Sequence, residues 1–198
     1  MKYTKCRLLI ALFLSFSSFG AMAEDGKLYG VFDIGKLNAP DACTGLPATM
    51  SCLDTATATR LGLGYQVIKD LGLEASYLFP TKISTSGTYL GFPLNIESTM
   101  SGYQLAIIGS IPVTGSFSLF GKLGMAFIDA KTTATSGSTT ITTSSNNTNF
   151  ASGVGLRYSF NDKVAARVMY ENFGNVKDSS SNTLSKVTML SAGIQVGF

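Results

Sequence analysis

Charged residues occur inside segments of this chain that are otherwise apolar. A charge left alone in apolar surroundings is costly, so such residues need partners. The six concerned are Arg60, Glu74, Lys122, Arg157, Arg167 and Glu171. We expect them to pair as one ion network around Glu74 and Glu171. That network could be a gate, in which a change of ion-pair partners opens a path for ions, or a static plug that satisfies buried charges.

Other chemistry finds little support. The chain has no histidine, which excludes a Ser-His hydrolase and a His-based metal site. Asp129, Asp162 and Asp178 are scattered in predicted turns and loops, and Gly153-Val154-Gly155 lacks the helix and the lysine of a phosphate loop. We therefore expect no enzymatic activity, no cofactor and no metal.

The N-terminus has the three parts of a signal peptide. Lys2, Lys5 and Arg7 precede the apolar run 8–16, and Ala21-Met22-Ala23 forms an A-x-A cleavage site. We predict a cleaved leader over 1–23 and one domain over 24–198. Removing the leader takes three of the 15 basic residues, which leaves 12 against 12 acidic ones and a net charge of zero. This balance gives no warrant for nucleic-acid binding.

Two cysteines remain after the leader and its Cys6 are removed, namely Cys43 and Cys52. Because an exported protein meets an oxidising compartment, we expect them to form a disulfide. The alternative is a pair of free thiols.

Alternation of apolar and small or polar residues predicts β-strands. Between Arg60 and Val67, for example, Leu61, Leu63, Tyr65 and Val67 share one face. The pattern recurs in eight segments, roughly 27–35, 57–67, 71–79, 99–110, 116–126, 149–160, 164–173 and 187–198. Their connections alternate between short (68–70, 111–115, 161–163) and long (36–56, 80–98, 127–148, 174–186). This predicts an all-β, eight-stranded, antiparallel up-and-down transmembrane barrel with three short periplasmic turns and four long extracellular loops. The Thr- and Ser-rich segment 131–149 is expected to be a mobile loop.

A soluble, lipocalin-like barrel would instead hold apolar side chains around a ligand. The last strand favours the membrane barrel, because one of its rows suits a narrow lumen: Val187, Met189, Ser191, Gly193, Gln195 and Gly197. Aromatic residues on the apolar faces fit interface girdles, namely Tyr65, Phe79, Tyr103, Phe117, Tyr158, Phe160, Tyr170 and Phe198. The six charges lie on the opposite faces and therefore point inward. An eight-stranded interior is just wide enough for its own side chains, which favours the plug.

These features resemble a stand-alone member of the OmpA-like transmembrane-domain family, also called outer-membrane β-barrel or opacity-type proteins. The resemblance covers 24–198. It rests on the segment that runs from 61–65 to Tyr77, on the segment 167–176, and on the terminal row of alternating apolar residues that ends in Phe198. It implies a lumenal ion cluster at Glu74, Lys122, Arg157, Arg167 and Glu171, and a first-loop disulfide between Cys43 and Cys52. It also implies that Phe198 belongs to the signal that the barrel-assembly machinery reads. The chain ends at the barrel, so we expect no peptidoglycan-binding domain.

The expected location is the outer membrane of a Gram-negative bacterium, with membrane lipid and lipopolysaccharide as surroundings and a monomeric state. The first hypothesis for function is a structural, envelope-integrity or adhesion-type role carried by the loops, which would meet a host or surface ligand. The second is a narrow ion or small-solute pore through the lumen. The third is a soluble ligand-binding barrel.

Overall fold

The computed structural model describes residues 27–198 except 45–46, 48, 90 and 178–182. The predicted leader 1–23 and Asp178 lie outside the described residues. No helix within the described part of the chain has the length and apolar character to cross a membrane.

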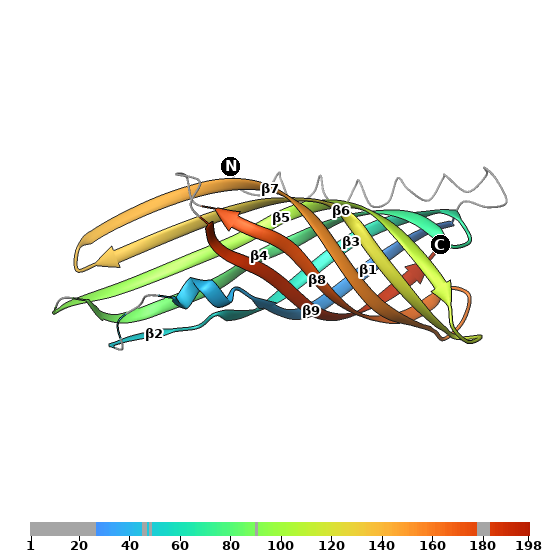
Figure 1. The fold of residues 1–198 in the computed structure, drawn as a ribbon, viewed down its shortest axis with the longest axis horizontal. Helices are drawn as coiled ribbons and strands as arrows, with labels where there is room; N and C mark the ends of the chain where they lie inside the picture. The colour runs from blue at the N-terminus through green and yellow to red at the C-terminus, as the bar shows by residue number, and fades with distance from the viewer. Residues whose placement is uncertain (1–26, 45–46, 48, 90, 178–182) are drawn as a thin grey trace, which may run out of the picture.

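Antiparallel strands form a closed ring (Figure 1). Its members are β1 (Lys27–Asn38), β3 (Thr55–Ile68), β4 (Leu71–Tyr89), β5 (Phe92–Pro112), β6 (Phe117–Ser136), β7 (Thr139–Ser159), β8 (Val164–Lys177) and β9 (Thr183–Gly197). Pairing of β4 with β5 and of β1 with β9 closes the ring. The 3-10 helix η2 (Pro40–Cys43) and the short strand β2 (Met50–Cys52) lie in the β1–β3 connection. The described residues form nine strands, and the eight other than β2 make the eight-stranded barrel that the sequence predicts.

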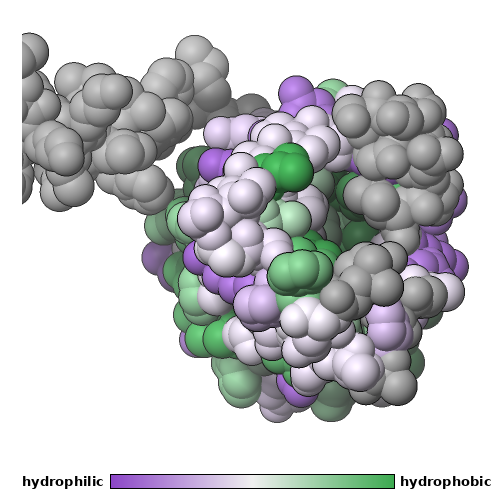
Figure 2. Space-filling view, turned by 90° about the vertical axis from the view of Figure 1, so that its left-hand side faces the viewer, coloured by the Kyte–Doolittle hydropathy of each residue, from purple (hydrophilic) through white to green (hydrophobic). Residues whose placement is uncertain are grey.

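Two of the four predicted long loops continue as strands instead. The segment 80–98 forms the outer parts of β4 and β5, and 127–148 those of β6 and β7, which pair up to Ser136 and Thr139. The segment 131–149 is therefore paired strand, and the prediction that it is a loop is wrong. Threonine is β-branched and favours strands, and hydroxyls of facing threonines lie within 3.3 Å across β6 and β7. The sheet thus projects beyond the barrel, and the surface at that end is mainly of intermediate hydropathy (Figure 2).

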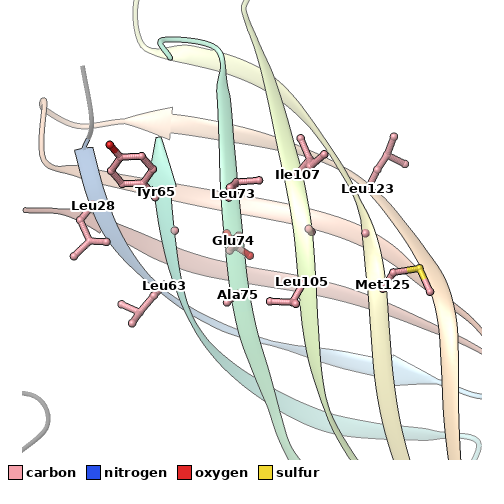
Figure 3. A pocket seen from close by; sticks show the side chains of 13 residues that line it. Leu28, Leu63, Tyr65, Leu73, Glu74, Ala75, Leu105, Ile107, Leu123 and Met125 are labelled. Atoms are coloured by element: carbon pink, nitrogen blue, oxygen red, sulfur yellow. The ribbon is translucent and has the colours of Figure 1, made fainter. Parts of the chain in front are cut away.

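Over the described residues, the apolar part of the outer wall forms one band. Leu63, Leu73 and Leu105 are about half exposed and point away from the barrel around Ala75 (Figure 3). Along β6, the outward row is largely apolar up to Phe127 and polar from Asp129 onward. Strand segments of about 9–11 residues suffice to cross a bilayer at a tilt, so the remaining outer parts of the strands stand above the lipid.

Gly35 permits the close approach of β1 and β9. A Cβ at this position would lie 2.2 Å from the carbonyl oxygen of Leu190 and 2.6 Å from Cα of Ser191. Since both contacts are backbone atoms, we expect Gly35→Ala to force the two strands apart and to lower the free energy of unfolding by about 1–3 kcal/mol. Urea unfolding in detergent micelles, followed by circular dichroism, measures this loss.

The same strand offers a matched control. A Cβ at Gly30 would meet only the ring of Phe198, at 3.7 Å, which is an ordinary contact. Gly30→Ala should therefore leave stability nearly unchanged. If both variants lowered the free energy of unfolding equally, close packing at the β1–β9 seam would not be the cause of the destabilisation in Gly35→Ala.

Candidate functional site

A cluster of charged residues lies at the middle of the lumen. Five of the six residues that the sequence predicts to pair are buried there, together with Asp33 of β1, which is not one of the six. The cluster, called here the charged centre, consists of Asp33, Arg60, Glu74, Lys122, Arg167 and Glu171. It holds three cations and three anions and is therefore neutral. The sequence signal for Asp33 is its place between two apolar residues, Phe32 and Ile34, which are both exposed.

Asp33 joins the two arginines of the charged centre. Arg60 donates from Nε and Nη2 to Asp33 Oδ2 at 3.0 and 2.9 Å. Arg167 donates from Nε to Oδ1 at 2.8 Å and from Nη2 to Oδ2 at 2.6 Å. All three side chains are nearly inaccessible to solvent. Without Asp33, two guanidinium groups would face each other in a space of low dielectric.

The two glutamates hold the rest of the charged centre together. Glu74 accepts from Lys122 Nζ at 2.9 Å and from Arg167 Nη1 at 2.8 Å. Glu171 accepts from Arg60 Nη1, and Lys122 Nζ lies 3.5 Å from its Oε1. Gln104 donates to Glu171 at 2.6 Å. Each charge thus has opposite charges as neighbours, as a buried ion network requires.

Arg157 stands apart from this network. It is an inward-facing residue of β7 and is the register partner of Arg167 on β8. It is only half-buried, forms no ion pair with any described residue, and its Nε has no hydrogen-bond partner. The structure therefore brings together the other five predicted residues but not Arg157.

Apolar side chains fill the lumen on both sides of the charged centre. The periplasmic side holds Ile108, Phe120 and Met169. The extracellular side holds a larger group, called here the apolar layer: Leu37, Ala39, Ala58, Leu78, Ile83, Met100, Ala126, Ile128, Ala151, Phe173, Val176, Val187 and Met189. The sequence instead predicts a lumen packed mainly with small and polar residues, such as Ser191, Gly193 and Gln195. Val187 and Met189 in the inward row of the last strand were the available signal.

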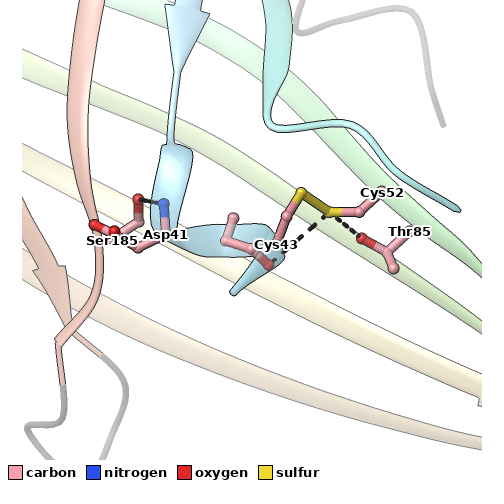
Figure 4. The surroundings of a disulfide bond; sticks show 6 residues. Asp41, Cys43, Cys52, Thr85 and Ser185 are labelled. Carbon is pink, nitrogen blue, oxygen red and sulfur yellow. Dashed lines mark hydrogen bonds between the residues drawn. A yellow bond between two sulfur atoms is a disulfide. The ribbon is translucent and has the colours of Figure 1, made fainter. Parts of the chain in front are cut away.

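The first connection is fastened to the projecting sheet. Cys43 and Cys52 form the predicted disulfide. The hydroxyl of Thr85 on β4 donates to Cys52 Sγ at 3.1 Å, and β2 pairs with the segment 85–87 of β4. On the other side, the N–H of Asp41 donates to Ser185 Oγ of β9 at 3.2 Å (Figure 4). The disulfide therefore holds η2 and β2 at fixed positions between β9 and β4.

Loss of the disulfide is expected to loosen this connection without unfolding the barrel. In the double variant Cys43→Ser and Cys52→Ser, amide hydrogen exchange should accelerate at Met50–Cys52 and at the paired segment 85–87 of β4. Exchange in the barrel strands below should not change, because their pairing does not involve β2. Folded barrels resist detergent until they are heated, so their mobility on a detergent gel shifts on boiling. If the double variant lost this heat-dependent shift, the disulfide would be needed for the barrel itself and not only for the first connection.

The C-terminal residue closes the last seam. Phe198 donates its N–H to the carbonyl of Leu28 at 3.0 Å, and the residue is 74% exposed on the outer wall. The ring is thus accessible on the lipid-facing side, as recognition during assembly would require. A role as the assembly signal stays a prediction.

A closed ring of antiparallel strands with an apolar outside and charges inside defines an outer-membrane β-barrel. Residues 23–198 match the model of the OmpA-like transmembrane domain, and the chain belongs to this family. This membership places it in the outer membrane.

Solved structures share the fold. The attachment invasion locus protein Ail of Yersinia pestis is 18% identical, with a TM-score of 0.54 over 89% of this chain and 100% of Ail. Neisserial surface protein A is 14% identical, with a TM-score of 0.53 over 88% of this chain and 100% of that one. A major outer membrane protein from Thermus thermophilus is 10% identical, with a TM-score of 0.53 over 87% of this chain and 99% of that one. No curated protein matches the chain by sequence.

Proposed function

We propose that this protein is a non-conducting membrane anchor that presents its extracellular sheet for surface interaction. The observation that carries the proposal is the projecting sheet itself. Outer parts of β4, β5, β6 and β7 continue their pairing well above the apolar band, and β2 and the disulfide hold the first connection against them. A barrel that served only as a pore would not need such a structure.

The filled lumen supports the anchor over the pore. The charged centre is neutral and fully paired, and the apolar layer lies on its extracellular side. An ion passing through the lumen would have to displace side chains of both the charged centre and the apolar layer. The charged centre has no excess charge that would attract an ion. We therefore expect no steady conductance from the purified protein in planar bilayers. A stable, voltage-independent conductance would favour the pore.

A truncation of the projecting sheet tests the surface role directly. Thr133 and Thr142 are register partners, as are Thr132 and Thr143. Replacing 133–142 by an Asn-Gly turn, which suits two-residue hairpins, would shorten the hairpin while keeping the pairing below it. Bacteria that display the truncated protein should bind less to cultured epithelial cells than bacteria that display the full one, at equal surface levels.

A structural neighbour suggests a ligand for a second binding test, in addition to the test with cultured cells. A second structure of Ail, which aligns with this chain at 16% identity, holds the heparin analogue sucrose octasulfate. Immobilised heparin is therefore a suitable probe for the purified protein. The truncation should leave the heat-dependent gel shift intact. Unchanged binding of the truncated form to both cells and heparin would overturn the proposed function.

A further inference from the structure

The projecting sheet has two edges, and among the described residues only one of them is covered. The β4 edge is paired with β2 through Met50–Cys52. Within the part of the chain that the structure describes, the β7 segment 139–146 pairs with β6 alone, because pairing of β7 with β8 begins at Ser152 and Asn172. We call the backbone of 139–146 on the side away from β6 the open edge. In Figure 1 this hairpin extends well beyond β8 and β9.

Asparagine side chains mark the point where β7 and β8 separate. Asn147 accepts from the N–H of Lys177 at 2.7 Å and donates to its carbonyl at 3.1 Å, and Asn149 donates to the carbonyl of Asn175 at 3.0 Å. These amides replace backbone pairing just below the open edge. Above Asn147, none of the described residues outside β6 pairs with the backbone of β7.

The open edge lacks the devices that usually prevent strand addition. Proteins protect edges with charged residues, proline, bulges or a covering segment. Between Lys131 and Arg157 the chain has no charged residue and no proline, and the β6–β7 register is unbroken. Five of the eight residues of the edge, four threonines and Ile141, are β-branched and favour strands.

A second copy in the same membrane does not fit this edge. Barrel strands are tilted by about 35–45° to the membrane normal. Two copies related by an axis along that normal would therefore present edges that cross at about twice this angle, and crossed strands cannot form a ladder. A free extended segment carries no such constraint.

We propose that the open edge binds an extended polypeptide segment of another protein as an added strand. This inference rests on the proposed surface role and names the class of partner. Side chains of neighbouring strands meet in rungs, and Ile96, Ala134 and Ile141 form one such rung. The partner places an apolar residue opposite Ile141, hydroxyl or β-branched residues opposite Thr140 and Thr142, and no charge.

A capped, fluorescent peptide of alternating threonine and valine or isoleucine, seven residues long by design, is a suitable probe. Binding to the full-length protein in nanodiscs is measured by fluorescence anisotropy, and hydrogen exchange locates it. We expect saturable binding with slowed exchange at 139–146. The same peptide with three consecutive central N-methyl groups, which remove donors from both of its edges, should bind at least about tenfold more weakly.

Two double variants separate the open edge from the rest of the sheet. Ile141→Lys with Thr143→Lys places charges beside the added strand and should weaken peptide binding by about tenfold or more. Ser84→Lys with Ser86→Lys places the same charges on β4 near the edge that β2 covers, and should leave binding unchanged. Heat-dependent gel mobility shows that both variants are folded.

Several outcomes would overturn the inference. The first two are that the N-methylated peptide binds as tightly as the unmodified one, or that hydrogen exchange slows outside 139–146. The third is that the unmodified peptide shows no saturable binding. The fourth is that the wild-type protein self-associates and that the double variant Ile141→Lys with Thr143→Lys does not. The last would assign the open edge to a second copy. If the hairpin truncation reduces binding to cells but the peptide does not bind, the proposed function stands and strand addition fails. If the peptide binds but the truncation has no effect on cells or heparin, the surface role fails instead.

Discussion

Replacing Asp33 by alanine is expected to lower the free energy of unfolding by about 3–5 kcal/mol. The variant removes the group that accepts from both Arg60 and Arg167 in the interior of the barrel. It leaves three cations with two anions in a space closed to solvent. The cost comes less from the lost hydrogen bonds than from the buried positive charge that remains unpaired.

This loss can be measured by urea unfolding in detergent micelles. Because the chain has no tryptophan, circular dichroism and the heat-dependent gel shift are the suitable signals. Adding Arg167→Met should restore part of the stability, since Arg60 and Lys122 would then balance Glu74 and Glu171. Glu97→Ala, which removes an exposed ion pair with Lys82, should have almost no effect. Similar losses for Asp33→Ala and Glu97→Ala would contradict the role assigned to the charged centre.

Replacing Phe173 by alanine should have an effect of similar size, about 3–5 kcal/mol. Phe173 is buried in the apolar layer, within the strand that also carries Glu171. Removing its ring leaves a cavity that the surrounding closed barrel has little freedom to fill. Phe173→Leu keeps most of the volume and should cost less than about 1.5 kcal/mol.

The same pair of variants distinguishes the barriers inside the lumen. Conductance should stay absent in Phe173→Ala, because the charged centre on the periplasmic side of this residue is unchanged. Conductance that appears in Phe173→Ala but not in Phe173→Leu would identify the apolar layer as the barrier to ions. Equal stability of the two variants would show that the ring is not part of a packed interior.

The sequence contained enough to predict the barrel and much of its chemistry. Alternation with period two does not depend on distant contacts, so the sequence alone assigns rows such as Leu61, Leu63 and Tyr65 to the outer face. The order of short and long connections then predicts the topology. The cost of exposing a charge to lipid likewise predicts that Glu74, Lys122 and Arg167 point inward.

Only the tertiary structure decided which inward residues meet. Strands in a barrel are staggered, so residues far apart in sequence, such as Asp33 and Arg167, share one height while Arg157 lies outside the network. An inward row also accepts apolar residues wherever neighbouring strands supply others at the same height, as around Phe173. In the same way, a Thr-rich segment becomes the outer part of β7 because β6 supplies a partner strand along its whole length. Local alternation follows from the sequence alone, but the height of a residue in the barrel and its partner across the lumen depend on how all eight strands are staggered.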